Sequence, residues 1–368
     1  MKLLIDFSPI KSGGGAQLAL NFLNYIQKTD INFCILVSDK FPYIDRIDND
    51  KDVIISPSSY YCRFLFENFN LKSVLKSRNI THIYTFFGPG LPSFKGIKQV
   101  VSVAYPIICN DESPYWTYIS KTEYIKKKAL NFLRKRRLSN ADFLLFETEI
   151  MQQRCTNVLG FNLEKTRVIP PSPTSFLKPS VEIRRNETVK FLLLSGLDSH
   201  KNIWRLIEVL PLIKSKGLNV KFVISCNEVE FKNKFSGYIN GISEGLVDDY
   251  FDFIGNISSD QIQSVYDTVD VMLNISDLES FSNNYMEAWR AKKPILASDT
   301  DFARSICGGS AIYTNPHNLD DLSYKIAMFA CSISDMEAMI RIGEEKLDLL
   351  PTLDERLHII TEIMRCKS

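Results

Sequence analysis

Two glutamates on either side of a predicted helix start are well placed to do chemistry. Glu279 follows an apolar run that predicts a strand at 271–275, and Glu287 comes eight positions later. Ser282, which lies between them, is a residue type that caps helix N-termini. Free N–H groups of the first helical turn would then bind a diphosphate, while the carboxylates bind ribose and sugar hydroxyls. The residues of that turn are Ser282, Asn283 and Asn284.

The same pair of glutamates also has a simpler interpretation. Acidic side chains near a helix N-terminus are stabilised by the helix dipole, so they occur there without any ligand. The spacing alone therefore leaves open both a nucleotide-sugar site and an ordinary helix start.

A glycine run follows the first predicted strand and precedes the first predicted helix. Glycines let a backbone approach a ligand closely, and the helix N-terminus behind them favours an anion. As a dinucleotide fingerprint the run is incomplete, because Leu18 stands at the third glycine position. Asp39, after the second predicted strand, leaves an NAD-dependent oxidoreductase open as an alternative. A tight turn without a ligand is another alternative. The run consists of Gly13, Gly14 and Gly15.

The elements that must position these residues alternate along the whole chain. Short apolar runs rich in β-branched residues are separated by helix-length segments, which predicts doubly wound α/β domains with parallel sheets. Ligands bind such sheets beyond the carboxyl ends of the strands. Strands are predicted at Lys2–Phe7, Phe33–Ser38, Val53–Ser56, His82–Phe87, Val100–Tyr105, Phe143–Glu147, Arg167–Ile169, Lys190–Ser195, Lys221–Cys226, Phe251–Ile254, Val271–Ile275, Ile295–Ser298 and Ala311–Thr314, and helices at Ala16–Lys28, Asn202–Lys216 and Leu353–Arg365.

The chain length predicts two domains. Its 368 residues are about twice what one hydrophobic core usually spans. A proline-rich polar stretch at 170–186 marks the boundary, so we expect domains at 1–175 and 188–350. The remaining helix, at 351–368, would cap the second domain or cross back to the first. The ligand site is expected between the domains, with loops from both.

Composition excludes several classes of protein. Apolar residues make up 45% and charged residues 24%, so the chain is neither disordered nor fibrous. Lys and Arg number 44 against 43 Asp and Glu, which argues against a nucleic-acid binder. The eight cysteines show no CxxC or metal-ligand spacing and predict reduced thiols in a cytoplasmic protein. No apolar stretch is long enough for a membrane span, and Asp6 interrupts the apolar start of the chain.

One segment is strongly basic. Residues 121–138 contain eight Lys or Arg against the single acid Glu123, with apolar residues at helical spacing. Such a helix is typical of a contact with an anionic membrane surface, and equally of a solvated helix with ordinary core contacts.

Several stretches in the expected order resemble the family 4 retaining glycosyltransferases with the GT-B fold, of the kind that builds bacterial surface polysaccharides. The stretch from Glu279 to Glu287 is similar to the E-x7-E signature of that family. Other stretches are similar to its phosphate loop, its turn near the nucleotide base and the segment closing its donor site. The stretches are Gly13–Gly15, Val168–Pro170, Ser195–Asn202, Phe253–Ile257, Leu278–Asp299, Ile306–Ala311 and Tyr313–Pro316.

The resemblance implies two Rossmann-like domains facing each other across a cleft, with the acceptor bound by the first domain and the nucleotide sugar by the second. It implies catalytic roles for Lys201, at the donor phosphates, and for Glu279, facing the donor sugar. It implies that Glu287 binds the ribose, that Ile257 lies near the base and that the glycine run approaches the leaving diphosphate. Neither a cofactor nor a metal is expected.

The chain also departs from the family pattern. An arginine five residues before Lys201 is replaced by Gly196, and the first half contains only one histidine, His82, at a predicted strand start. Asp111 and Glu112 are possible replacements for a histidine at the acceptor. The D-x-D sequences at 48–50 and 299–301 are no more frequent than chance predicts. These departures leave a non-catalytic sugar-binding scaffold open as an alternative.

The sequence thus predicts an enzyme that transfers a sugar from a nucleoside diphosphate-sugar to a saccharide, which we expect to be lipid-linked, in surface-polysaccharide or O-antigen synthesis. Its partners would be the donor, this acceptor and an anionic membrane surface, with no nucleic acid. Its place would be the cytoplasm or the inner face of the cytoplasmic membrane.

Overall fold

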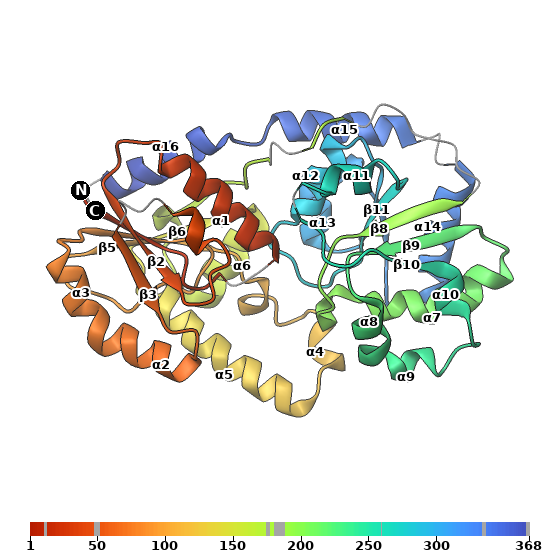
Figure 1. The fold of residues 1–368 in the computed structure, drawn as a ribbon, viewed down its shortest axis with the longest axis horizontal. Helices are drawn as coiled ribbons and strands as arrows, with labels where there is room; N and C mark the ends of the chain where they lie inside the picture. The colour runs from red at the N-terminus through yellow and green to blue at the C-terminus, as the bar shows by residue number, and fades with distance from the viewer. Residues whose placement is uncertain are drawn as a thin grey trace. The chain divides into compact units, whose positions relative to one another are not determined.

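The computed structural model divides into two compact units, each built on one parallel sheet (Figure 1). It describes residues 1–10, 13–47, 52–173, 177–179, 188–258, 260–332 and 336–365, with Gly13, Gly14 and Ser332 described by their backbone only. The first unit comprises Met1–Glu112, Ser120–Ser172 and Pro351–Ser368, and the second comprises Ser113–Ile119 and Pro173–Leu350.

In the first unit, seven described strands form a sheet in the order β3-β2-β1-β4-β5-β6-β7, and every neighbouring pair is parallel. The order changes direction between β1 and β4, where ligands bind open α/β sheets. The strands are β1 (Leu3–Asp6), β2 (Phe33–Ser38), β3 (Asp52–Ser56), β4 (His82–Thr85), β5 (Lys98–Val103), β6 (Phe143–Phe146) and β7 (Thr166–Val168). The helices are α1 (Gly13–Ile26), η1 (Ile44–Arg46), α2 (Tyr60–Leu65), η2 (Phe66–Asn70), α3 (Leu71–Ser77), η3 (Pro106–Ile108), α5 (Lys121–Leu138), α6 (Glu149–Leu159), η4 (Leu163–Lys165) and α16 (Leu353–Arg365).

Helices cover both faces of the first sheet. Successive side chains of a strand point to opposite faces. Leu3 and Ile5 of β1 accordingly pack in one core cluster with α1 and α16, whereas Leu4 packs in another with α3. Helix α16 is fixed there by its own carbonyl at Ile363, which accepts a 2.6 Å hydrogen bond from Lys98 Nζ. The last helix is therefore part of the core of the first unit.

In the second unit, six described strands form a parallel sheet in the order β10-β9-β8-β11-β12-β13, which changes direction between β8 and β11. The strands are β8 (Val189–Leu193), β9 (Val220–Ile224), β10 (Phe251–Phe253), β11 (Val271–Asn274), β12 (Ile295–Ser298) and β13 (Ile312–Thr314). The helices are α4 (Tyr115–Tyr118), η5 (Ser199–Lys201), α7 (Ile203–Ser215), α8 (Glu228–Lys234), α9 (Ser236–Ile239), α10 (Leu246–Tyr250), α11 (Ile262–Tyr266), α12 (Asn283–Arg290), α13 (Asp301–Cys307), η6 (Gly308–Ser310), α14 (Leu319–Ser332) and α15 (Glu337–Asp348).

The second sheet is also buried on both faces. Phe191 and Leu193 of β8 pack in one cluster with α7 and α14, and Leu192 packs in another with α12 and α13. Burial on both faces explains why these strands are largely apolar in the sequence.

The predicted fold class is confirmed: each unit is a Rossmann-like α/β domain with a parallel sheet. Every predicted strand is present, with ends that differ by at most two residues. The predicted helix at Leu353–Arg365 is α16 itself. None of the helices in the described part of the chain combines the length and apolarity needed to cross a bilayer.

Candidate active site

The candidate donor residues of the second unit lie where its sheet changes direction. The loop after β8 leads to η5 and Lys201, and the loop after the neighbouring strand β11 carries Glu279. Because parallel strands end at the same edge of a sheet, these two loops meet.

Lys201 and Glu279 form an ion pair of 2.5 Å between Nζ and Oε1. Burial raises the pKa of Glu279, but the Lys201 ammonium, the His200 ring and the Ser276 hydroxyl outweigh it, so the pKa is lowered overall. The two side chains keep 21% and 13% of their surface exposed, so a ligand can reach both. The structure therefore supplies a cation and an ionised carboxylate side by side.

Backbone contacts hold the two loops together. Asn202 adopts a left-handed conformation with φ of 55°, and its Nδ2 donates to the Ile275 carbonyl at 3.0 Å. The Asp277 N–H donates to the His200 carbonyl at 2.8 Å. Asn202 is completely buried, so this hydrogen bond fixes the direction in which η5 presents Lys201.

Helix α12 begins beside the same loops. Ser282 occupies the N-cap position as predicted, although its side chain makes no capping hydrogen bond. Asn284 Nδ2 donates to the Leu194 carbonyl at 2.8 Å, which ties the first turn of α12 to the end of β8. The N–H groups at the start of a helix have no partner within the helix. Those of Ser282, Asn283 and Asn284 therefore lie at the edge where Lys201 is held.

Glu287 lies in the second turn of α12 and is partly buried. Burial raises its pKa to about 7, against which the Tyr266 hydroxyl acts by donating to Oε2 at 3.4 Å. Hydrogen bonds donated by a ligand would stabilise the charged form of a carboxylate that burial disfavours in this way. The two glutamates thus differ: Glu279 is paired with a cation, whereas Glu287 accepts a hydrogen bond from the Tyr266 hydroxyl.

The remaining predicted donor residues lie in elements other than the two loops that hold Lys201 and Glu279. Ile257 lies in the loop after β10, at the same edge of the second sheet, and is partly buried. Gly13, Gly14 and Gly15 form the first turn of α1 in the first unit. A Cβ at Gly15 would meet no heavy atom within 4 Å, so packing does not require a glycine at that position. The roles of these residues remain predictions.

A polar chain that the sequence reasoning missed lies close to the ion pair. The Tyr118 hydroxyl donates to Asp277 Oδ2 at 2.7 Å, and His317 Nε2 lies 2.9 Å from Asp277 Oδ1. Arg205 Nη2 lies 2.9 Å from His317 Nδ1 and also pairs with Glu208. The members come from four separate stretches of sequence, so no spacing could have connected them.

The structure also locates the residues at which the chain departs from the family. Gly196 is exposed, and Arg205, the next arginine, is engaged as described above. His82 begins β4, at the sheet edge opposite the one where ligands bind, and burial lowers its pKa. Asp111 pairs with Lys128 at 2.5 Å. In the second D-x-D sequence Asp299 pairs with Arg304, whereas the first, at 48–50, lies outside the described residues.

Comparison with known proteins identifies the family of one domain of the chain. Residues 178–345 match the family model described as glycosyl transferases group 1. No curated protein matches the chain in sequence.

The chain is similar in structure to sucrose-phosphate synthase from Thermosynechococcus elongatus (14% identity, 99% and 98% of the two chains covered, TM-score 0.74). It is also similar to HepE of Anabaena in complex with UDP and glucose (15% identity, 99% of each chain, TM-score 0.72). A third similar structure is the apo form of the lipopolysaccharide outer core galactosyltransferase WaaB (15% identity, 98% and 99% covered, TM-score 0.65). The chain therefore has the GT-B fold and contains a group 1 glycosyl transferase domain.

Proposed function

We propose that the protein is a retaining hexosyltransferase of family 4 that uses a nucleoside diphosphate-sugar. The observation that carries this proposal is the Lys201–Glu279 pair at the point where the second sheet changes direction, inside the segment that matches the glycosyltransferase model. The complex of the structurally similar HepE with UDP and glucose supports a nucleotide-sugar donor.

The donor would lie along the edge formed by the loops after β8 and β11 and the start of α12. Lys201 and the first N–H groups of α12 would bind the diphosphate, and Glu287 would accept hydrogen bonds from the ribose. Ile257 would lie near the base and Glu279 would face the sugar. Gly13, Gly14 and Gly15 of the first unit would approach the departing diphosphate.

When the glycosidic bond breaks, negative charge develops on the leaving diphosphate. A fixed ammonium and fixed amides stabilise such charge without reorganising, which is the largest catalytic contribution that these residues can make. Glu279 holds the Lys201 ammonium in position at 2.5 Å before the donor binds. We expect no cofactor and no metal in this reaction, because the chain itself supplies the positive charge.

The acceptor would be a saccharide carried on a lipid, in the synthesis of a bacterial surface polysaccharide such as O-antigen, and the first unit would bind it. The structural similarity to a lipopolysaccharide galactosyltransferase supports this class of acceptor. The enzyme would act in the cytoplasm, bound peripherally to the inner face of the membrane.

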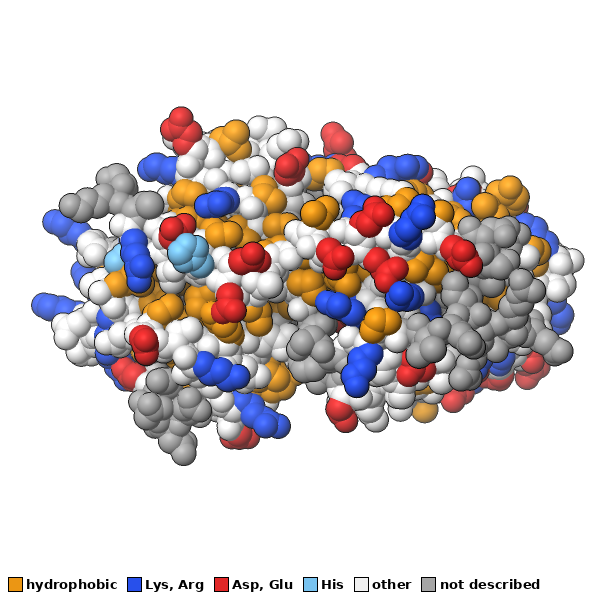
Figure 2. All heavy atoms as spheres, turned by 90° about the horizontal axis from the view of Figure 1, so that it is seen from above, with side chains coloured by type: hydrophobic (Ala, Val, Ile, Leu, Met, Phe, Trp, Pro, Cys, Tyr) orange, Lys and Arg blue, Asp and Glu red, His pale blue; other side chains and the backbone are white. Residues whose placement is uncertain are grey.

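Helix α5 supports attachment to an anionic surface. Its Ile125 and Phe132 side chains are 67% and 66% exposed, so they do not serve as core contacts. Carboxylates pair with four of its eight basic residues, Lys127, Lys128, Lys135 and Arg137. Within the described residues, the other four have no acidic partner. On the face drawn in Figure 2, by contrast, side chains of both signs intermingle.

The proposed function can be tested by calorimetry against UDP, GDP, dTDP and NAD, followed by an assay of sugar release from the matching donor. We expect one nucleoside diphosphate to bind, and NAD not to bind. Lys201→Ala should reduce turnover more than it reduces nucleotide affinity, because the charge that Lys201 neutralises develops in the transition state. Nucleotide binding without any transfer or hydrolysis would favour the sugar-binding scaffold instead.

A further inference from the structure

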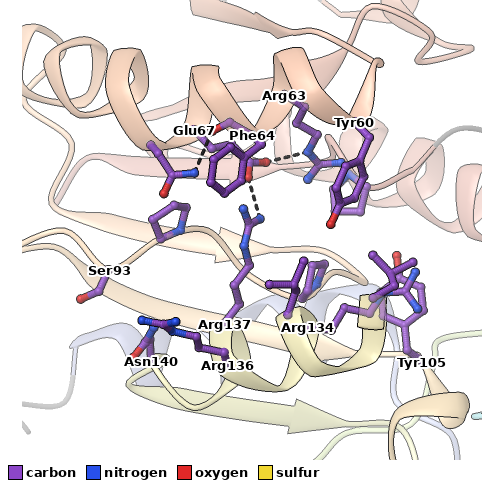
Figure 3. A pocket seen from close by; sticks show the side chains of 16 residues that line it. Tyr60, Arg63, Phe64, Glu67, Ser93, Tyr105, Arg134, Arg136, Arg137 and Asn140 are labelled. Carbon is purple, nitrogen blue, oxygen red and sulfur yellow. Dashed lines mark hydrogen bonds and ion pairs between the residues drawn. The ribbon is translucent and has the colours of Figure 1, made fainter. Parts of the chain in front are cut away.

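The first unit contains a pocket of about 550 Å³ at the point where its own sheet changes direction (Figure 3). Pro9, Pro89 and Tyr105, from the loops after β1, β4 and β5, contribute to its lining. These strands are neighbours in the sheet, and the loops lie at the edge where open α/β sheets bind ligands. The volume is in the range of small-molecule sites.

Two of the four arginines in the lining are held by the protein itself. Glu67 has 1% of its side chain exposed and pairs at 2.6 Å with Arg63 Nε and at 2.6 Å with Arg137 Nη1. Arg63 also donates to the carbonyl and the hydroxyl of Ser8, both at 3.0 Å. These contacts join α2 and η2 to α5 and to the loop after β1, so they build the pocket.

The other two arginines, Arg134 and Arg136 of α5, line the same pocket with spare donors. Arg134 Nη1 donates to Asn131 Oδ1 at 3.2 Å, and its guanidinium lies 4.5 Å from the centre of the Tyr105 ring. Within the described residues, no carboxylate pairs with Arg134 or Arg136. Burial disfavours the charge on Arg134 and lowers its pKa, a cost that a bound anion would offset. Guanidinium groups match phosphate oxygens in geometry as well as charge.

The pocket is apolar as well as basic. Tyr60, Phe64 and Leu133 belong to its lining and are 63%, 47% and 43% exposed. Figure 3 shows Tyr60 and Phe64 on the α2 side and Arg134, Arg136 and Arg137 on the α5 side. A ligand that used the whole site would carry an anionic group and an apolar chain together.

We propose that this pocket binds an amphiphile through a phosphate or diphosphate group, with Arg134 and Arg136 on the phosphate oxygens and Tyr60, Phe64 and Leu133 on the apolar chain. The interpretation of this amphiphile as the carrier of the acceptor rests on the proposed function. The binding site itself does not depend on the donor chemistry.

The test uses calorimetry on the full chain saturated with the nucleoside diphosphate that binds most tightly in the panel above, so that the probes cannot bind at the donor residues. The probes are geranyl diphosphate, inorganic pyrophosphate and geraniol. We expect geranyl diphosphate to bind more tightly than either of the others, since only it offers both chemical features. Arg134→Gln combined with Arg136→Gln should weaken its binding at least about tenfold, the loss expected for charge-assisted hydrogen bonds. Arg134→Lys with Arg136→Lys should restore part of the affinity.

The matched control is Lys121→Gln combined with Lys126→Gln, which removes the same charge from α5 outside the pocket lining. It should leave the affinity for geranyl diphosphate unchanged. An equal loss of affinity in both double variants would show that only the general surface charge matters. An equal affinity for pyrophosphate and geranyl diphosphate would show that the apolar side chains do not contribute to binding. Either result overturns the proposal. The affinity for that nucleoside diphosphate, measured on every variant, reports folding and tests the donor site separately.

Discussion

Glu287→Gln should make the unliganded protein more stable near pH 8. Burial raises the pKa of Glu287 from 4.5 to about 7, because loss of water disfavours the charged form. An acid whose pKa is raised in the folded state destabilises the fold progressively as the pH rises from its unfolded pKa to its folded pKa. At about 1.4 kcal/mol per pKa unit the cost is about 3 kcal/mol, which partial exposure of the side chain reduces to about 2 kcal/mol.

The same substitution should weaken the binding of UDP, or of whichever nucleotide the panel identifies. Glutamine retains the shape and the acceptor for the Tyr266 hydroxyl but loses the charge. A hydrogen bond to a charged group is worth about 1.5–3 kcal/mol, so the affinity should fall by one to two orders of magnitude. In the wild type the affinity should also rise with pH through about 7, as Glu287 ionises; in the variant only the smaller rise caused by ionisation of the nucleotide's own terminal phosphate should remain.

Thermal unfolding near pH 5 and pH 8 and calorimetry across the same range measure both effects. The gain in Tm should be clear near pH 8 and small near pH 5, where the folded protein holds Glu287 protonated. Glu279→Gln is the matched control, with the opposite expected effect. The pKa of Glu279 is lowered in the folded protein, so its carboxylate stabilises the fold at pH values above its unfolded pKa. The variant should therefore have a lower Tm than the wild type near pH 8. A lower Tm for Glu287→Gln near pH 8, or unchanged nucleotide affinity, would refute the reasoning.

The fold could be predicted from the sequence because its signals are local. Strands buried on both faces are largely apolar, so β8 and β11 are visible in the sequence as the apolar runs at 191–193 and 271–273. The division of the chain is different, because it depends on contacts between distant segments. The short segment 113–119 belongs to the second unit although the residues on both sides of it belong to the first, and no composition change marks it.

The candidate site could be predicted only in part. Glu279 and Glu287 were found because one local stretch contains them both, and Lys201 because a resemblance connected it to them. The polar chain through Asp277 and His317 could not be found, since its members are brought together only by the packing of α4, α7 and the loops after β11 and β13. Exposure cannot be read from spacing either: the apolar residues at helical spacing in α5 fitted both a membrane contact and a core contact, and only the structure shows that Phe132 is exposed.

Two further perturbations test the parts of the molecule beyond the donor residues. Lys121→Gln with Lys126→Gln should release the protein from phosphatidylglycerol-containing vesicles, because each Lys near an anionic surface contributes about 1 kcal/mol to membrane binding. Equal sedimentation of wild type and variant with these vesicles would contradict the proposed membrane contact. Neutral phosphatidylcholine vesicles are the control. Tyr118→Phe should lower the Tm, because its hydroxyl donates a 2.7 Å hydrogen bond to Asp277, a residue with 3% of its surface exposed. Loss of a donor to a buried charged acceptor costs about 1–3 kcal/mol. Tyr238→Phe is the matched control, since Tyr238 is 40% exposed and stacks on Trp204, and its hydroxyl has no hydrogen-bond partner among the described residues. If both variants melted alike, Asp277 would have to be satisfied by its other partners, and the segment 113–119 would be held in the second unit by its packing and not by this hydrogen bond.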